Sequence, residues 1–435
     1  MDNRPVKIYS HNDSPRLHYI AGIVFSDILG LQWEIVTDRR KLGKHPVINY
    51  STENIGGSVK ISPDTLIFET GIKAREIVMG EWKGLPVFFQ TSKDSDLPFD
   101  LFAASFYMVS RYEEYLDYVP DEYGRFRASS SLAFRNGFLG RPVVDLWTWE
   151  FARVLLKNYP TIAFRRNEFR SLVSIDTDQP FEYLGKNLIT SVGGLIRDIF
   201  QNNGSAGDRY KVVIHEKKDP FEVYDYITGI IDEFKADSIF FFPTGDHSGH
   251  DRNPSWKNEE YRELIRKISS RFNTGLHPSF RSSGICRLLE KELSRLKNIT
   301  GLDIVSSRFH YLKLTFPASY RHLIKAGISE DYSMGFPDEP GFRAGIARPY
   351  YFYDVPEEIQ TNLRIVPFQV MDATLYQYKK LDPAGSGEII IRIINEIVQA
   401  GGLFVSIWHN TSMLDSPEWK EWRKLFELTL QKQQS

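Results

Sequence analysis

The stretch Leu172-Val173-Ser174-Ile175-Asp176-Thr177-Asp178 decides the fold class, because a short β-prone run leads directly into two acidic side chains. Two later stretches repeat this arrangement with histidine, namely Gly275-Leu276-His277-Pro278-Ser279 and Ser406-Ile407-Trp408-His409-Asn410. In α/β proteins the carboxyl ends of parallel strands carry the reactive side chains. The three stretches therefore predict an enzyme whose site combines a carboxylate pair with imidazoles.

From residue 169 onward, expected strands alternate with expected helices. Residues 238–242 are an apolar run typical of a strand, and the next segment places Tyr261, Leu264, Ile265 and Ile268 on one helical face. We expect further strands at residues 274–276, 303–305, 331–334 and 403–407, and helices over residues 285–296 and 388–399. This alternation indicates parallel βα units, closed as a barrel or left open.

The chain of 435 residues is longer than one core usually serves, so we expect two domains. The first part has a mixed pattern, with strands expected at residues 65–68 and 85–89 and helices over residues 100–115 and 147–156. A polar, basic stretch, Arg165-Arg166-Asn167-Glu168, then precedes the first acidic strand. We predict a mixed α+β domain over residues 1–165 and a βα-rich domain over residues 166–435.

Composition excludes several classes of function. A net charge of -2 gives no electrostatic reason to expect nucleic acid or an anionic membrane as partner. The single cysteine, Cys286, excludes an intramolecular disulfide and a thiolate zinc site. No apolar run reaches the length of a membrane span, and Met1-Asp2-Asn3-Arg4 lacks the pattern of a signal peptide. We therefore expect a cytoplasmic protein.

Asp176 and Asp178 are two residues apart, so on a regular strand both would project to one face. Two carboxylates this close call for a cation or a shared proton nearby. One can bind a metal while the other acts as general base on a water molecule. The alternative is structural: one of the two caps a helix or turns the loop.

Histidines follow in several contexts. His277 precedes proline, which holds its backbone extended at a strand end, and His409 could be a general acid, a metal ligand or a structural residue. The residue types of Asp246-His247-Ser248-Gly249-His250-Asp251 would suit a metal, but the polar, glycine-containing run favours a mobile loop. Arg308-Phe309-His310-Tyr311 adds a guanidinium and another imidazole, and Asp331 opens a further expected strand.

The order and spacing of these motifs resemble the polysaccharide deacetylase superfamily, also called nodulation-deacetylase-like or carbohydrate esterase family 4. Gly341-Phe342-Arg343-Ala344-Gly345 resembles its divergent bacterial branch. Ser110-Arg111-Tyr112-Glu113-Glu114-Tyr115 and Gly124-Arg125-Phe126 resemble the uncharacterised domain that precedes such domains in Bacteroidetes proteins. The resemblance covers nearly the whole chain and implies a distorted (β/α) barrel.

The resemblance also implies roles for single residues. It makes Asp176 the base, Arg308 the residue that orients the base, and His409 the acid. Asp178 and His277 become ligands of a divalent metal, with zinc expected first. Substrate contacts are expected from His310, Tyr311, Asp331 and Trp408. The implied activity is hydrolysis of an N-acetyl or O-acetyl group on a sugar or glycan precursor.

One position departs from the family pattern. The family usually carries a second histidine four residues after the first, and here Arg281 stands there. Asp176, Asp246 or a water molecule could complete the ligand set, or the charge of Arg281 could replace the metal. The second case would give an inactive barrel that binds a glycan or a protein partner. A glycosidase with paired carboxylates is a third possibility, which the histidines disfavour.

Overall fold

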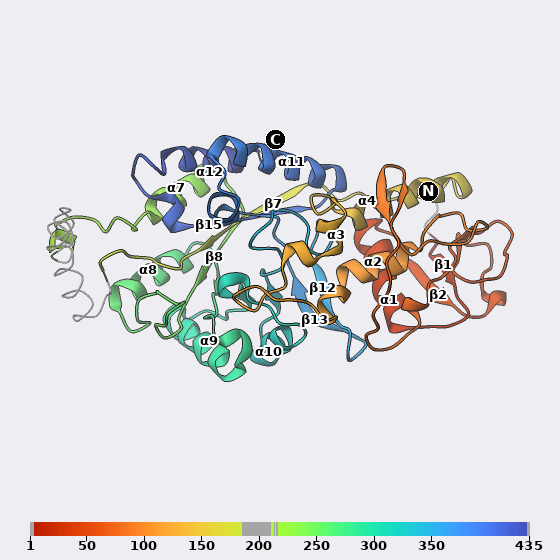
Figure 1. Ribbon diagram of the computed structural model, residues 1–435, viewed down its shortest axis with the longest axis horizontal. Helices are drawn as coiled ribbons and strands as arrows, with labels where there is room; N and C mark the ends of the chain where they lie inside the picture. Colours follow the sequence, from red (N-terminus) through yellow and green to blue (C-terminus); the bar gives the residue numbers. More distant parts are fainter. Residues whose placement is uncertain (1–3, 185–209, 213, 215, 433–435) are drawn as a thin grey trace.

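The computed structural model describes residues 4–184, 210–212, 214 and 216–432. Its largest element is a nine-stranded sheet that runs through the part of the chain after residue 169 (Figure 1). In spatial order its strands are β12 (Tyr350–Asp354), β13 (Ile359–Ile365), β11 (Glu330–Asp331), β10 (Ser306–Ser307), β9 (Asn273–Leu276), β8 (Ser238–Phe242), β7 (Arg170–Asp176), β15 (Leu403–His409) and β14 (Val370–Met371). A mixed α/β architecture with a large sheet, as predicted from the sequence, is confirmed.

Parallel pairing brings the carboxyl ends of the central strands to one edge of this sheet. β7 lies between β8 and β15, and the register places His409 directly beside Asp176. On the other side of β8, β9 pairs with β10 so that Leu276 faces Ser307. The residues that follow these two positions are His277 and Arg308, so four reactive side chains end up at the same edge of the sheet.

The predicted barrel is not closed by strand pairing in the described part of the chain. β12 and β14 are the two edges of the sheet, and β12 pairs antiparallel with β13. Isolated backbone hydrogen bonds span the gap: Phe368 donates to Met334, and Gly341 donates to Gln369. The segment between β11 and β12 is irregular there, so it approaches β14 without forming a ladder.

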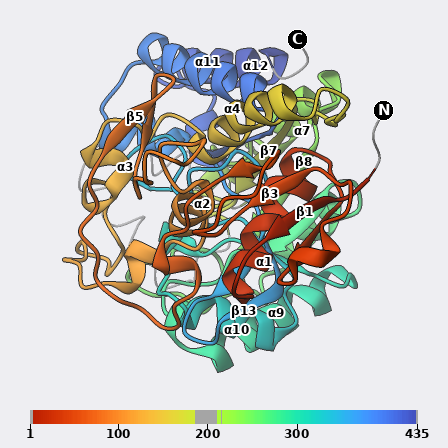
Figure 2. The same cartoon turned by 90° about the vertical axis from the view of Figure 1, so that its right-hand side faces the viewer.

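Helices cover the sheet on opposite sides (Figures 1 and 2). α11 and α12 pack against each other on the β15 side, whereas α8, α9 and α10 contact β8, β9 and β13. Their bounds are α7 (Tyr224–Glu233), α8 (Glu259–Ser269), α9 (Cys286–Thr300), α10 (Ala318–Ala326), α11 (Pro383–Ala400) and α12 (Lys420–Lys432). Of the described helices none is long and apolar enough to cross a bilayer. Residues 1–3, on which the expected lack of a signal peptide partly depends, lie outside the described residues.

The first part of the chain has its own small sheet, drawn in red and orange in Figure 1. Its four strands are all parallel, in the order β2 (Trp33–Val36), β1 (Val6–Tyr9), β3 (Val47–Asn49) and β4 (Val59–Lys60). A short antiparallel pair, β5 (Gly80–Trp82) and β6 (Leu85–Val87), follows. The helices are α1 (Pro15–Ala21), α2 (Leu101–Val109), α3 (Leu132–Arg135) and α4 (Val143–Asn158). This unit, for which we expected a mixed α+β pattern, combines a parallel sheet, a short antiparallel pair and helices.

Three local predictions are wrong. Residues 65–68 were expected as a strand, but Thr65–Ile67 form a 3₁₀ helix because Asp64 caps it by accepting from the Leu66 amide. The strand expected at residues 303–305 lies instead at Ser306–Ser307. Asp331 ends β11 instead of opening a strand. Each error concerns a stretch of only a few residues, where apolar side chains fit a buried helical turn as well as a strand.

Buried ion pairs join the first unit to the large sheet. Arg343 Nε donates to Glu114 Oε1 at 2.8 Å, and both side chains are about 2 % exposed. Arg348 Nε donates to Asp145 Oδ1 at 2.6 Å, also in the interior. Charges removed from water need such partners. One hydrophobic cluster also continues from the first unit into the second, so the two units share a common core.

Candidate active site

A cavity of about 340 Å³ opens at the carboxyl end of the central strands. Its lining mixes carboxylates, imidazoles, guanidiniums and aromatic rings. It includes Arg125, Asp176, Asp178, His250, Arg252, His277, His310, Tyr311, Asp372, Tyr376, Tyr378 and His409. Concave pockets with convergent titratable groups are the usual form of an enzyme site.

Asp176 is buried and held by Arg308. Arg308 Nη1 donates to Asp176 Oδ1 at 2.8 Å, and its other donors reach Ser174 Oγ at 2.8 Å and the Tyr332 carbonyl at 3.1 Å. The guanidinium is fully buried and lies 4.5 Å from the centre of the Phe241 ring. Because all three donor groups are used, Arg308 fixes the orientation of the Asp176 carboxylate.

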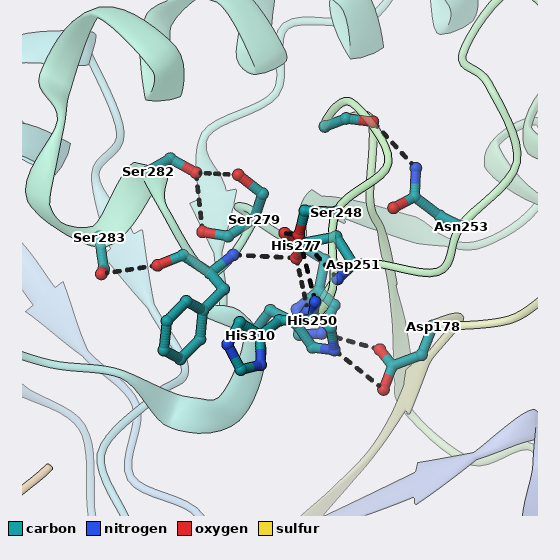
Figure 3. Close-up of polar contacts among 12 residues, drawn as sticks. Asp178, Ser248, His250, Asp251, Asn253, His277, Ser279, Ser282, Ser283 and His310 are labelled. Atoms are coloured by element: carbon teal, nitrogen blue, oxygen red, sulfur yellow. Dashed lines mark hydrogen bonds and ion pairs between the residues drawn. The ribbon is translucent and has the colours of Figure 1, made fainter. Parts of the chain in front are cut away.

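Asp178, His277 and His310 offer ligand atoms that lie within 4.8 Å of one another (Figure 3). His277 Nε2 is 3.0 Å from Asp178 Oδ1, and His310 Nε2 is 3.4 Å from Asp178 Oδ2. The first distance is short, but its geometry is not that of a hydrogen bond, so the buried Oδ1 has no hydrogen-bond partner among the described residues. A buried carboxylate oxygen without a hydrogen bond, facing imidazole nitrogens, belongs to a donor set that suits a divalent cation.

Contacts of the Nδ1 atoms fix the orientation of both imidazole rings. His277 Nδ1 lies 2.6 Å from the Arg308 carbonyl, and His310 Nδ1 lies 2.9 Å from Asp251 Oδ1. These contacts leave both Nε2 atoms facing Asp178, the arrangement that metal-binding histidines adopt in proteins. Burial favours the neutral form of His310, but the charges of Asp178 and Asp251 raise its pKa to about 9. Burial likewise opposes ionisation of Asp178, yet His310 and His277 hold its pKa well below the usual range.

His409 also approaches Asp178, with its Nε2 3.6 Å from Asp178 Oδ2. Its Nδ1 is 2.7 Å from Asp372 Oδ1, and its backbone amide donates to Asp372 Oδ2 at the same distance. Ser412 Oγ also donates to Asp372. Burial lowers the pKa of His409, but Asp372, Asp178 and Asp176 together raise it to about 10. These carboxylates therefore favour the protonated form of the imidazole.

The structure brings most of the predicted site residues into this cavity, but not all. Asp176, Asp178, His277, His310, Tyr311 and His409 line it, and Arg308 supports it from behind. Asp331 and Trp408 lie in the interior instead: Asp331 accepts from Ser333, and the Trp408 indole donates to Ser406 Oγ. These two were expected to contact substrate, and neither is part of the lining. A side chain at the very end of a strand can point into the core as well as into the cavity.

Arg281 does not stand where a metal would bind. It is exposed at the start of a short 3₁₀ turn and is not part of the cavity lining. The second imidazole next to His277 comes instead from His310, which follows the neighbouring strand β10. The expectation that the Arg281 charge replaces a metal is therefore wrong.

Sequence reasoning missed two supporting carboxylates, Asp251 and Asp372. Both are about 1 % exposed, and each binds the Nδ1 atom of one histidine. Asp372 follows the short apolar strand β14, which is the same signal that pointed to Asp176. Asp251 belongs to the run at residues 246–251 that was expected to be a mobile loop, and no local pattern distinguishes it there.

Comparisons with known proteins cover parts of the chain. Residues 6–160 match the model of a family of unknown function, DUF7033. No curated protein matches the chain.

Several solved structures are similar to part of the chain. A protein from Mycobacterium smegmatis described as a "putative polysaccharide deacetylase" is 15% identical, over 61% of this chain and 85% of that one, with a TM-score of 0.39. A 4-alpha-glucanotransferase from Thermococcus litoralis is 13% identical, over 62% of this chain and 38% of that one, with a TM-score of 0.35. A CE4 family pseudoenzyme from Bacillus anthracis is 10% identical, over 62% of each chain, with a TM-score of 0.31. Structural neighbours thus include deacetylases of family CE4, at low TM-scores.

Proposed function

We propose that this protein is a metal-dependent hydrolase that removes an acetyl group from a sugar of a glycan or glycan precursor, with an N-acetyl group as the first candidate. The observation that supports it most is the convergence of Asp178, His277 and His310, with both imidazoles fixed through Nδ1. The proposal includes the division of the chain at residues 165/166, with the site in a deacetylase-type second domain.

The three side chains fit a divalent cation. One carboxylate oxygen and two imidazole nitrogens form the kind of ligand set that zinc has in hydrolytic enzymes, which keep a further position open. Asp178 Oδ1, which is buried and has no hydrogen-bond partner among the described residues, is the atom best placed to bind a cation. When bound, such an ion polarises an acyl carbonyl and lowers the pKa of water.

The remaining residues supply the proton transfers. Asp176 is the base in this proposal, and its ion pair with Arg308 keeps the carboxylate in one orientation while it takes a proton from the attacking water. His409 is the acid: the Asp372 contact keeps it protonated, so it can give a proton to the leaving nitrogen. Base and acid stand at paired positions of two neighbouring strands, and the acid is 3.6 Å from Asp178.

The test is release of acetate from a panel of N-acetylated and O-acetylated mono- and oligosaccharides, with zinc, cobalt or manganese added. We expect metal-dependent release that is lost in Asp176→Asn and His409→Ala. The matched control is His18→Ala, which changes a half-exposed histidine near Asp13, far from the cavity lining. It should retain full activity.

Two negative results together would refute the hydrolase proposal. If the folded protein retained no metal and released no acetate from the whole panel, the hydrolase proposal would fail. The chain would then fit a non-catalytic protein that binds a glycan or a protein partner.

A further inference from the structure

Four aromatic side chains gather at one edge of the cavity. The rings of His250 and Phe280 stack with their centres 4.1 Å apart and an angle of 28° between them. Tyr123 and Tyr311 lie 5.0 Å apart, and Tyr311 also contacts Phe280 at 5.4 Å. His250 and Tyr311 line the cavity itself, and His250 is exposed while the other three rings are half-buried. His250 and Tyr311 thus give the cavity an aromatic edge, backed by the other two rings, on which a sugar ring can lie.

The first unit of the chain completes this edge. Arg125 Nη1 donates to the Tyr311 carbonyl at 2.7 Å, and its guanidinium lies 4.7 Å from the centre of the Tyr123 ring. Tyr311 and the following Leu312 have φ values of 60° and 53°, in the left-handed region that non-glycine residues avoid. The Arg125 hydrogen bond holds this strained turn in place, so the loop of the first unit helps shape the cavity wall.

Two cations flank the aromatic edge without acidic partners. Arg252 is exposed and lines the cavity, directly after Asp251. Lys313 Nζ lies 3.8 Å from the centre of the Phe280 ring, on the stack that His250 completes. Neither forms an ion pair or a side-chain hydrogen bond with another described residue. Burial lowers the pKa of Lys313, and no neighbouring acid opposes this shift.

Two nearby acids, Asp251 and Asp121, are already engaged. Asp251 accepts from Ser248 and the Phe280 amide and contacts His310, whereas Asp121 is paired with Arg125 at 2.7 Å. The charge of Arg125 is thereby compensated, but the charges of Arg252 and Lys313 are not. A guanidinium in the cavity lining and an ammonium over the Phe280 ring, both without acidic partners, are suited to a phosphate or a carboxylate.

We propose that this edge, formed by His250, Phe280, Tyr311, Arg252 and Lys313, is a subsite for an anionic sugar, which carries a phosphate or a carboxylate next to the acetylated residue. The sugar part rests on the proposed function, whereas the anion part rests on the two unpartnered cations. The sugar ring lies against the aromatic faces, and its negative group lies between Arg252 and Lys313. The substrate is then a charged glycan or a phosphorylated sugar, in preference to a neutral polymer.

Calorimetric binding separates this inference from the catalytic one, because it needs no turnover. The ligands are N-acetylglucosamine and N-acetylglucosamine 1-phosphate, together with neutral diacetylchitobiose and a glucuronic acid–N-acetylglucosamine disaccharide. A chelator in the buffer prevents hydrolysis during the titration. We expect at least one anionic ligand to bind about tenfold more tightly than its neutral counterpart, with a preference that weakens as salt rises. The anionic ligand with the larger gain in affinity over its neutral counterpart shows whether the subsite prefers a phosphate or a carboxylate.

The double variant Arg252→Gln/Lys313→Gln should bring the anionic ligands down to the affinity of the neutral ones. Its matched control, Lys93→Gln/Arg135→Gln, removes one lysine and one arginine that are exposed elsewhere, and should keep the preference. Equal affinities in the wild type, a preference that survives in the double variant, or no binding of any of the four ligands would each overturn the subsite. Loss of the preference together with intact acetate release from neutral sugars would leave the hydrolase proposal standing.

Discussion

The Nδ1 atom of His310 lies 2.9 Å from Oδ1 of Asp251, a carboxylate that is about 1 % exposed. This contact orients the Nε2 atom of His310 toward Asp178. Through its second contact, with the Phe280 amide, Asp251 also ties down the loop that follows His277. One carboxylate thus positions the region around both imidazoles of the candidate metal site.

Asp251→Ala should therefore weaken metal binding by about 10- to 100-fold, the usual cost of losing a carboxylate behind a metal-bound histidine. Competition with a chromophoric chelator measures this change. Asp246→Ala is the control: this exposed aspartate in the same loop pairs with Lys291 and Arg295, away from His310. Equal metal affinity in Asp251→Ala and the wild type would show that Asp251 has no such role.

Asp372→Asn should narrow the pH range of activity from the alkaline side. Asp372 is a main cause of the raised pKa of His409, and the charged imidazole is present only below that pKa. Removing the negative charge lowers this pKa, so the alkaline limb of the kcat profile should move to lower pH. The rate at neutral pH should fall by about 100-fold or less, the lower part of the range for a general acid.

A pH profile recorded for both proteins with the same acetylated sugar provides the measurement. An alkaline limb that stays in place in Asp372→Asn would mean that His409 is not the acid. The acidic limb should not move in either case, since it reports a different group.

Glu114→Ala should destabilise the whole protein by about 3 to 5 kcal/mol, because it leaves Arg343 and Arg111 buried without their shared partner. Thermal or urea unfolding measures the change. Glu421→Ala, which breaks an exposed pair with Lys424, should cost less than about 0.5 kcal/mol. If Glu114→Ala unfolded only the first 165 residues and left the large sheet unaffected, the coupling of the two units would be refuted.

The sequence was most informative where a strand and its last side chain lie next to each other in the chain. Asp176, His277 and His409 follow apolar runs that form β7, β9 and β15, and parallel pairing alone then brings them to one edge. The strand β10 consists of only two paired residues, both serine, so no apolar run marks it in the sequence. His310, which follows it, was consequently assigned to substrate contact.

The second imidazole near Asp178 shows why the family's four-residue spacing between histidines did not identify it. The residue four positions after His277 is Arg281, whereas the second imidazole near Asp178 is that of His310, 33 residues after His277 and just beyond the next strand of the sheet. Contacts of this kind depend on tertiary packing, as do those of Asp251 and Asp372 with their histidines. Burial of such carboxylates has no signature in the local sequence.

The most direct test of the central claim is the zinc affinity of the wild type and of His310→Ala, measured by chelator competition and by metal content after gel filtration. We predict one tightly bound ion per chain in the wild type, and in His310→Ala a loss of affinity of at least about 100-fold with the fold retained. Arg281→Ala should bind zinc like the wild type. Absence of bound zinc in the wild type, or unchanged affinity in His310→Ala, would contradict the three-ligand site.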